Sequence, residues 1–210
     1  MDDYKTLIKR IGLVGIANLL VALSSIILLP ILTNNLSIDD YAIWIQFNVS
    51  VSLIPIVVVV GLHYSMMRFL PGVENRNIIR EGFYSVFFII LFIGSIVATL
   101  IYLFSNQLAS ILFNGNLLVS KILAPAVLII SLNSILLNYF VTFQKMKKYS
   151  LFLIIQTYMG VFFVSYLLSS GFGIFGAIIG FLFPYVILAA ILFLLIIRDI
   201  GFQIPKFHFT

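Results

Sequence analysis

Several chemical groups are scarce or missing in this chain, and each absence excludes a class of protein. The sequence contains no cysteine, which excludes a disulfide framework, a thiolate nucleophile and a thiolate metal site. Charged residues make up only 9% of the 210 residues, whereas 62% are hydrophobic, and the mean hydropathy is +1.20. A soluble domain of this length could not bury so much apolar surface in its core. The composition therefore indicates an integral membrane protein.

Acidic residues are absent from the six long apolar runs that the sequence contains. Each run is near or above the roughly 20 residues that a helix needs to cross a bilayer. Backbone polar groups in lipid must be satisfied internally, and barrel strands alternate in polarity over about ten residues, so these runs predict helices. We expect an all-α integral membrane protein, a six-transmembrane-helix bundle. The expected spans are 11–33, 42–67, 83–104, 117–140, 151–169 and 174–197.

Positive charge alternates between the connections that join these runs. Eleven of the twelve lysines and arginines lie in the N-terminal arm, in the second and fourth connections, or in the tail, and Lys121 is the exception. Cytoplasmic connections are enriched in Lys and Arg, so the pattern predicts that both termini are cytoplasmic. A net charge of +5 can also indicate nucleic acid. These cations flank membrane exits, however, so we expect the lipid bilayer as partner and no nucleic acid.

Small and polar residues follow one face of three expected helices. Asn18 and Ser25 share a face of the first helix, Asn48 and Ser52 lie four residues apart on the second, and the fourth carries Asn138. Such faces belong against other helices or a watery cavity, because lipid offers them no partner. For any single face, interhelical packing and the lining of a cavity both remain open. Three amides in one six-helix unit favour a hydrated interior.

Two glycines of the sixth run have a spacing that favours close helix packing. Gly176 and Gly180 are four residues apart, in the small-x-x-x-small pattern that lets two helix backbones approach each other. The spacing predicts a tight contact between the sixth helix and a neighbour.

Few residues could support catalysis. Asp39 and Asp40 lie in the first outer connection, where membrane glycosyltransferases that use polyprenyl-linked sugars keep acidic residues. Ser37 also makes this stretch resemble a capping box, with the acids at the positive end of a helix dipole. No second acidic cluster accompanies them, and neither His63 nor His208 has a plausible serine partner. We therefore expect no enzymatic activity, no catalytic residue, no cofactor and no metal site.

Four segments, in order along the chain, resemble polysaccharide flippases. Residues 29–41 (LPILTNNLSIDDY) are similar to the first outer loop of that family, and residues 61–69 (GLHYSMMRF) to the end of its second helix. Residues 142–149 (TFQKMKKY) resemble its basic loop after helix four, and residues 173–177 (GIFGA) the Gly-rich start of helix six. The family is the polysaccharide-transporter branch of the multidrug/oligosaccharidyl-lipid/polysaccharide (MOP) exporters, which have a MATE-like fold.

The resemblance implies a two-bundle transporter of which this chain is the N-terminal half. It implies that the protein moves a polyprenyl-pyrophosphate-linked oligosaccharide of the O-antigen, or lipopolysaccharide, type from the cytoplasmic to the outer leaflet. The membrane it implies is a bacterial or archaeal cytoplasmic (inner) membrane. The implied partners are a missing C-terminal half or a second copy, together with a polysaccharide polymerase and glycosyltransferases.

The resemblance also divides the chain into segments. We expect a cytoplasmic interfacial arm over residues 1–10, in which Lys5, Lys9 and Arg10 accompany apolar side chains. The bundle then occupies 11–197, and 198–210 form a cytoplasmic link to the second half.

Arg68 matches the family's arginine after helix two. It is a candidate for contact with the pyrophosphate headgroup, and the alternative is an arginine that sets topology and snorkels to the interface. Lys121, the lone cation near the outer face, either lines an exit or is an ordinary interfacial residue. The substrate-path candidates are Arg68, Asn18, Ser25, Asn48, Ser52, Asn138 and Lys121.

Two alternative functions remain. A multidrug exporter of the same superfamily is disfavoured, because coupled exporters usually need a carboxylate inside the membrane. A polyprenyl-sugar-dependent membrane glycosyltransferase that uses Asp39 and Asp40 is less favoured still.

Overall fold

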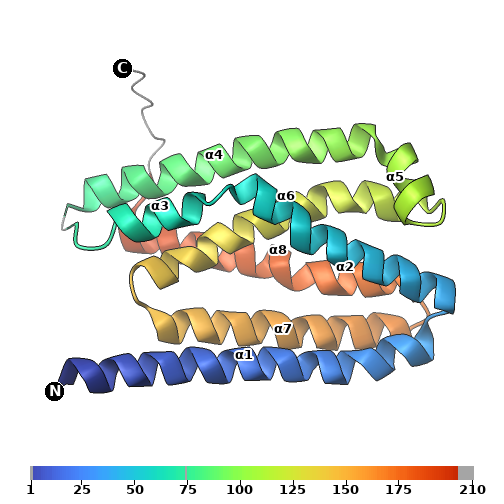
Figure 1. Cartoon of the computed structure of the whole chain (residues 1–210), viewed down its shortest axis with the longest axis horizontal. Helices are drawn as coiled ribbons and strands as arrows, with labels where there is room; N and C mark the ends of the chain where they lie inside the picture. The colour runs from blue at the N-terminus through green and yellow to red at the C-terminus, as the bar shows by residue number, and fades with distance from the viewer. Residues whose placement is uncertain (1, 74, 203–210) are drawn as a thin grey trace.

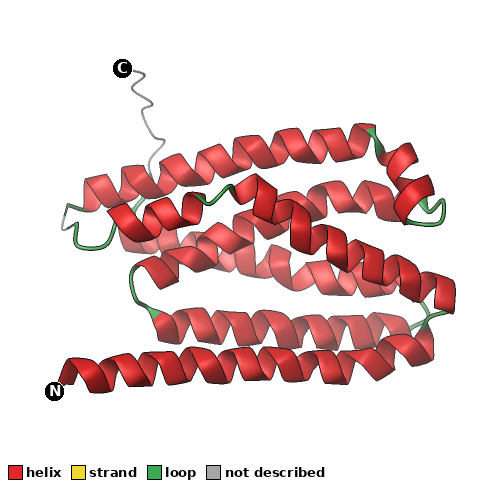
Figure 2. Cartoon of the chain, viewed as in Figure 1, coloured by secondary structure: helices red, strands yellow, loops and turns green. Residues whose placement is uncertain are grey.

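The computed structural model describes residues 2–73 and 75–202, which form eight helices and no strand (Figure 2). Six of these helices are long and apolar enough to cross a membrane. The expected all-α, six-helix membrane bundle is therefore confirmed, and the chain is a multi-pass membrane protein. The long helices are α1 (Asp2–Asn35), α2 (Ile38–Val59), α4 (Arg76–Leu103), α6 (Leu117–Thr142), α7 (Met146–Ser169) and α8 (Gly173–Ile200), and the short ones are α3 (Leu62–Phe69) and α5 (Ser105–Leu112).

Polar side chains cap the first turns of α2, α4 and α6. The hydroxyl oxygen of Ser37 accepts a hydrogen bond from the backbone N–H of Asp40 at 3.1 Å. The side-chain oxygens of Asn75 and Asn116 cap α4 and α6 in the same way. Caps satisfy backbone donors that have no partner within the helix, and they fix the residue at which each helix begins.

The apolar run over 42–67 is divided into two helices, where the sequence predicts one span. Val60 (φ 42°, ψ 38°) and Gly61 (φ 70°) both adopt the left-handed conformation, which ends α2 at Val59. A β-branched residue is rarely found in this conformation, and the Val60 side chain is 66% exposed. Helix α3 then begins at Leu62 and carries Arg68 in its last turn.

One end of the bundle, here called the basic end, carries most of the positive charge. The start of α1, the start of α4, the α6–α7 connection and the end of α8 all lie there (Figure 1). Contacts between distant segments hold them together: the Tyr84 hydroxyl donates to the carbonyl of Gly201 at 3.0 Å, and Lys145 forms an ion pair with Asp199. The described cations of the basic end are Arg10, Arg68, Arg76, Arg80, Lys145, Lys147, Lys148 and Arg198.

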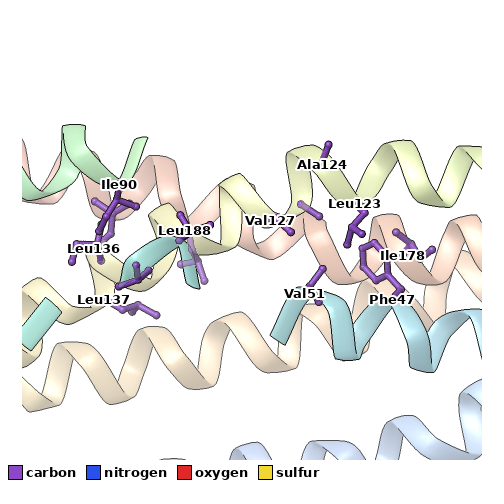
Figure 3. Close-up of a cluster of buried hydrophobic side chains, with 14 of the residues drawn as sticks. Phe47, Val51, Ile90, Leu123, Ala124, Val127, Leu136, Leu137, Ile178 and Leu188 are labelled. Atoms are coloured by element: carbon purple, nitrogen blue, oxygen red, sulfur yellow. The ribbon is translucent and has the colours of Figure 1, made fainter. Parts of the chain in front are cut away.

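Helix α6 forms the centre of the bundle. It packs against α2, α4, α7 and α8, whereas α1 packs chiefly on α7. Buried side chains from four helices meet around it, including Phe47, Ile90, Val127 and Leu188 (Figure 3). Lipid tails are as apolar as these side chains, so van der Waals packing holds the helices together, rather than removal of surface from water.

Glycine allows α7 and α8 to approach each other closely. A Cβ atom built on Gly180 would lie 2.7 Å from the backbone nitrogen of Val164, and one on Gly176 would lie 3.2 Å from the carbonyl oxygen of Leu167. The predicted tight contact is confirmed, and α7 is the helix that makes it.

The Gly180→Ala substitution should separate α7 from α8. We expect it to destabilise the protein by about 1–3 kcal/mol, because the new methyl group meets backbone atoms that cannot turn aside. Thermal unfolding in detergent should show a lower melting temperature. Gly160→Ala is the matched control, since its Cβ would meet only Pro184 Cγ, at 4.0 Å. Equal melting temperatures for the two variants would contradict this account of the contact.

Candidate functional site

Two open cavities, each lined by both polar and apolar side chains, lie between the helices of the bundle. Cavity I has a volume of about 300 Å³ and is lined by α1, α2, α7 and α8. Cavity II has a volume of about 510 Å³ and is lined by α2, α3, α6 and α8. Tyr185 of α8 lines both, so the two cavities adjoin.

The cavities follow each other along α2. Trp44 and Asn48 from the first half of α2 line cavity I, whereas Ser52 and Val59 from its second half line cavity II. Helix α2 starts at the end opposite the basic end and runs toward it (Figure 1). Cavity I therefore lies nearer the opposite end, and cavity II nearer the basic end.

Four of the seven predicted substrate-path residues lie on these cavities. Ser25 and Asn48 line cavity I, and Ser52 and Asn138 line cavity II. Three different helices supply them, and Ser25 and Ser52 are exposed in this chain. The bundle thus brings polar residues from distant parts of the sequence to two cavities that share Tyr185.

Three of these side chains each donate one hydrogen bond within their own helix. The Asn48 amide donates to the carbonyl of Trp44 at 2.9 Å, and the Asn138 amide donates to that of Ser134 at 2.9 Å. The Ser52 hydroxyl donates to the carbonyl of Asn48 at 2.7 Å. Each amide has a second N–H donor and an acceptor oxygen, which water or a ligand in the cavities can use.

Asn133, by contrast, is an interhelical residue. It is buried, and its amide donates to the backbone carbonyl of Tyr185 at 3.3 Å, from α6 to α8. This contact joins α6 to Tyr185, which lines both cavities.

Gln156 of α7 is a cavity residue that sequence reasoning missed. It lines cavity I, is buried, and its Oε1 atom has no hydrogen-bond partner among the described residues. A buried amide oxygen of this kind is costly unless water or a ligand binds it. The sequence could have indicated this residue, because Gln156 is the only amide side chain in the apolar run 151–169.

The remaining three predicted residues lie elsewhere. Asn18 lines a groove between α1 and the α6–α7 connection. Arg68 is exposed on α3, with its guanidinium 5.5 Å from the centre of the Phe69 ring. Lys121 lies in the second turn of α6 at the opposite end, with its ammonium 5.8 Å from the ring of Tyr102 on α4, within cation–π range.

The alternative catalytic residues occupy a helix start. Asp39 and Asp40 are in the first turn of α2, which Ser37 caps as the sequence predicts. No group of three or more His, Asp or Glu side chains with metal-site geometry occurs within 2–73 and 75–202. His63 lines cavity II, and its partial burial lowers its pKa, which favours the neutral imidazole. His208 lies outside the described residues.

Comparison with known proteins finds no matching family model, no similar curated protein and no similar solved structure. The chemistry of the site therefore has to be judged from its geometry. Neutral hydroxyl and amide groups around adjoining cavities can solvate a polar, uncharged molecule inside the bilayer.

Cysteine substitution should reveal whether water fills cavity II, since the chain has no cysteine of its own. We expect a charged methanethiosulfonate reagent to modify Ser52→Cys at least about tenfold faster than Leu53→Cys, because only a hydrated thiol ionises. Leu53 is the neighbouring residue, is 59% exposed and lines neither cavity. Equally slow modification of both variants would mean that the cavity is dry.

Proposed function

We propose that this chain is the N-terminal bundle of a transporter that flips a polyprenyl-pyrophosphate-linked oligosaccharide from the cytoplasmic to the outer leaflet, for cell-surface polysaccharide of the O-antigen type. The observation that carries the proposal is the serial arrangement of cavities I and II along α2. A glycan needs a hydrated path across the hydrocarbon, whereas its prenyl tail can remain in lipid.

The chemistry of the path suits a glycan. Ser25 and Asn48, followed by Ser52 and Asn138, present hydroxyls and amides to the two cavities. Sugar hydroxyls are both donors and acceptors, so they pair with either group. The sequence resemblance to polysaccharide flippases, carried by four ordered segments, supports the same substrate class.

The exposed residues of the path call for a second wall. Ser25 and Ser52 are exposed although they line cavities, so one side of the path is uncovered by this chain. A C-terminal half or a second copy would supply that wall. Alternating access would then follow from rocking of one bundle against the other.

The proposed orientation places the basic end and both termini in the cytoplasm of a bacterial or archaeal cell, in the cytoplasmic (inner) membrane. Arg68 would then contact the pyrophosphate headgroup at the start of the path. It lies four residues after Tyr64, which lines cavity II, so the two share one face of α3. Glycosyltransferases would act before the flipping step, and a polysaccharide polymerase would act after it.

A multidrug exporter of the same superfamily ranks second. Asp39 and Asp40 lie in the first turn of α2, Glu81 lies in the second turn of α4, and Asp199 lies in the last turn of α8. These carboxylates are near helix ends, whereas ion-coupled export favours one deep within the membrane.

The Asn48→Leu/Asn138→Leu variant tests the path in cells that depend on the native gene. Leucine has a similar size but cannot solvate a glycan, so we expect surface polysaccharide to fall by at least about tenfold at normal protein level. Lipid-linked oligosaccharide should accumulate in the cytoplasmic leaflet. Val49→Leu, on the exposed lipid side of α2, is the matched control and should export normally. Normal export by the double variant would overturn the proposed path.

The Asp39→Asn/Asp40→Asn variant separates the transporter from the glycosyltransferase. Ser37 still caps α2 in this variant, and asparagine has nearly the size of aspartate, so we expect the protein to fold and export to remain within about twofold of normal. Loss of sugar transfer to the lipid carrier, with normal membrane insertion, would favour the enzyme instead.

A further inference from the structure

A pocket at the basic end is separate from the two cavities of the path. It has a volume of about 490 Å³ and lies between α1 and the start of α7. None of its lining residues lines cavity I or cavity II. This headgroup pocket is lined by Arg10, Leu13, Gln144, Lys145, Met146, Lys147 and Lys148.

Among the described residues, the headgroup pocket carries more positive charge than negative charge. Of its four cations, Lys145 is paired with Asp199, which also accepts a hydrogen bond from the Tyr139 hydroxyl at 2.7 Å. Arg10, Lys147 and Lys148 have no carboxylate partner within the described parts of the chain. The three-residue connection between α6 and α7 brings these lysines close to α1, with Gln144 in the left-handed conformation (φ 55°).

An apolar groove continues from the headgroup pocket along α1. This chain groove has a volume of about 540 Å³ and is lined mainly by apolar atoms. Arg10, Gln144 and Met146 line both sites, and the Arg10 guanidinium donates to the Gln144 side chain at their boundary. The rest of the lining is Ile11, Val14, Gly15 and Asn18, which cover two turns of α1.

Glycine keeps the chain groove open. A Cβ atom built on Gly15 would meet no atom within 4 Å, so a larger side chain there would extend into free space. The groove is open at its surface, since Ile11, which lines it, is 63% exposed. A hydrocarbon chain could thus enter it from the bilayer.

We propose that the headgroup pocket and the chain groove together bind an anionic phospholipid of the surrounding leaflet. The phosphate lies against Arg10, Lys147 and Lys148, and one acyl chain runs along α1 from Ile11 toward Asn18. Basic pockets between transmembrane helices bind anionic headgroups, and the free backbone N–H groups at the start of α7 add to the attraction. The chain groove offers contacts to an acyl chain, which a phospholipid has and a free phosphate lacks. This inference requires only that the chain spans a membrane, so it does not rest on the proposed transport.

The bound lipid would hold α1 in the bundle. Helix α1 packs chiefly on α7, and the site lies where these two helices meet at the basic end. A lipid that contacts both would join α1 to α7 through its headgroup and its chain.

The first part of the test changes the charge of the site. Native mass spectrometry measures how the purified chain binds dioleoyl-phosphatidylglycerol. Lys147→Gln/Lys148→Gln should weaken binding by at least about tenfold. Arg76→Gln/Arg198→Gln removes the same charge from exposed positions of the basic end outside the site, and should bind as the unsubstituted chain does. Phosphatidylcholine with the same chains should bind at least about tenfold more weakly than phosphatidylglycerol. Equal loss of phosphatidylglycerol binding in both charge variants would mean that only the overall positive charge attracts the lipid. That result would overturn the proposed site.

The second part of the test fills the chain groove without changing its charge. Gly15→Leu should weaken phosphatidylglycerol binding, whereas Gly12→Leu should not, because Gly12 is equally open but lines neither site. Circular dichroism and gel filtration establish that both variants fold. Unchanged binding by Gly15→Leu, together with displacement of the lipid by inorganic phosphate, would make this a simple anion site. Displacement by undecaprenyl diphosphate at far lower concentration than by phosphatidylglycerol itself would make it a cargo site. Either result would overturn the phospholipid proposal.

Discussion

The hydrocarbon of the bilayer contains no solvent that could bond with polar groups, so the protein must supply hydrogen-bond partners for its own backbone and side chains. This constraint governs the whole bundle. It explains why every described long segment is a helix. It also explains why Asn48, Ser52 and Asn138 donate to carbonyls one turn earlier on their own helices. The Gln156 oxygen has no such partner among the described residues, and Gln156 lines cavity I. Such an oxygen needs water or a ligand as its partner, and the cavities are the places in the bundle that can hold one.

The spans could be predicted from the sequence because length and hydropathy alone decide whether a segment crosses a bilayer. The break after Val59 could not, because it depends on backbone conformation at Val60 and Gly61 inside an uninterrupted apolar run. The contact through Gly180 was predictable from its spacing with Gly176, but its partner helix was not. Helical periodicity shows which residues share a face, and says nothing of which helix that face meets.

The same limit applies to the candidate site. Ser25, Asn48, Ser52 and Asn138 were recognisable as polar residues on helix faces, and the bundle brings them to adjoining cavities. Tyr185 joins these cavities, yet in the sequence it is one of ten tyrosines. Two residues of α1 also differ in their surroundings, since Ser25 lines cavity I whereas Asn18 lies at the groove proposed for lipid. A polar path and a lipid site can thus coexist on one helix without shared residues.

The central claim is that the cavities along α2 carry a glycan across the membrane. The most direct measurement uses vesicles that contain the protein as its own gene encodes it, loaded with fluorescent polyprenyl-pyrophosphate-linked oligosaccharide. An impermeant glycosidase added outside reports how fast glycan arrives from the inner leaflet. The account predicts that the protein raises this rate well above that of protein-free vesicles, and that Asn48→Leu/Asn138→Leu abolishes the increase. A rate equal to that of protein-free vesicles would contradict the account.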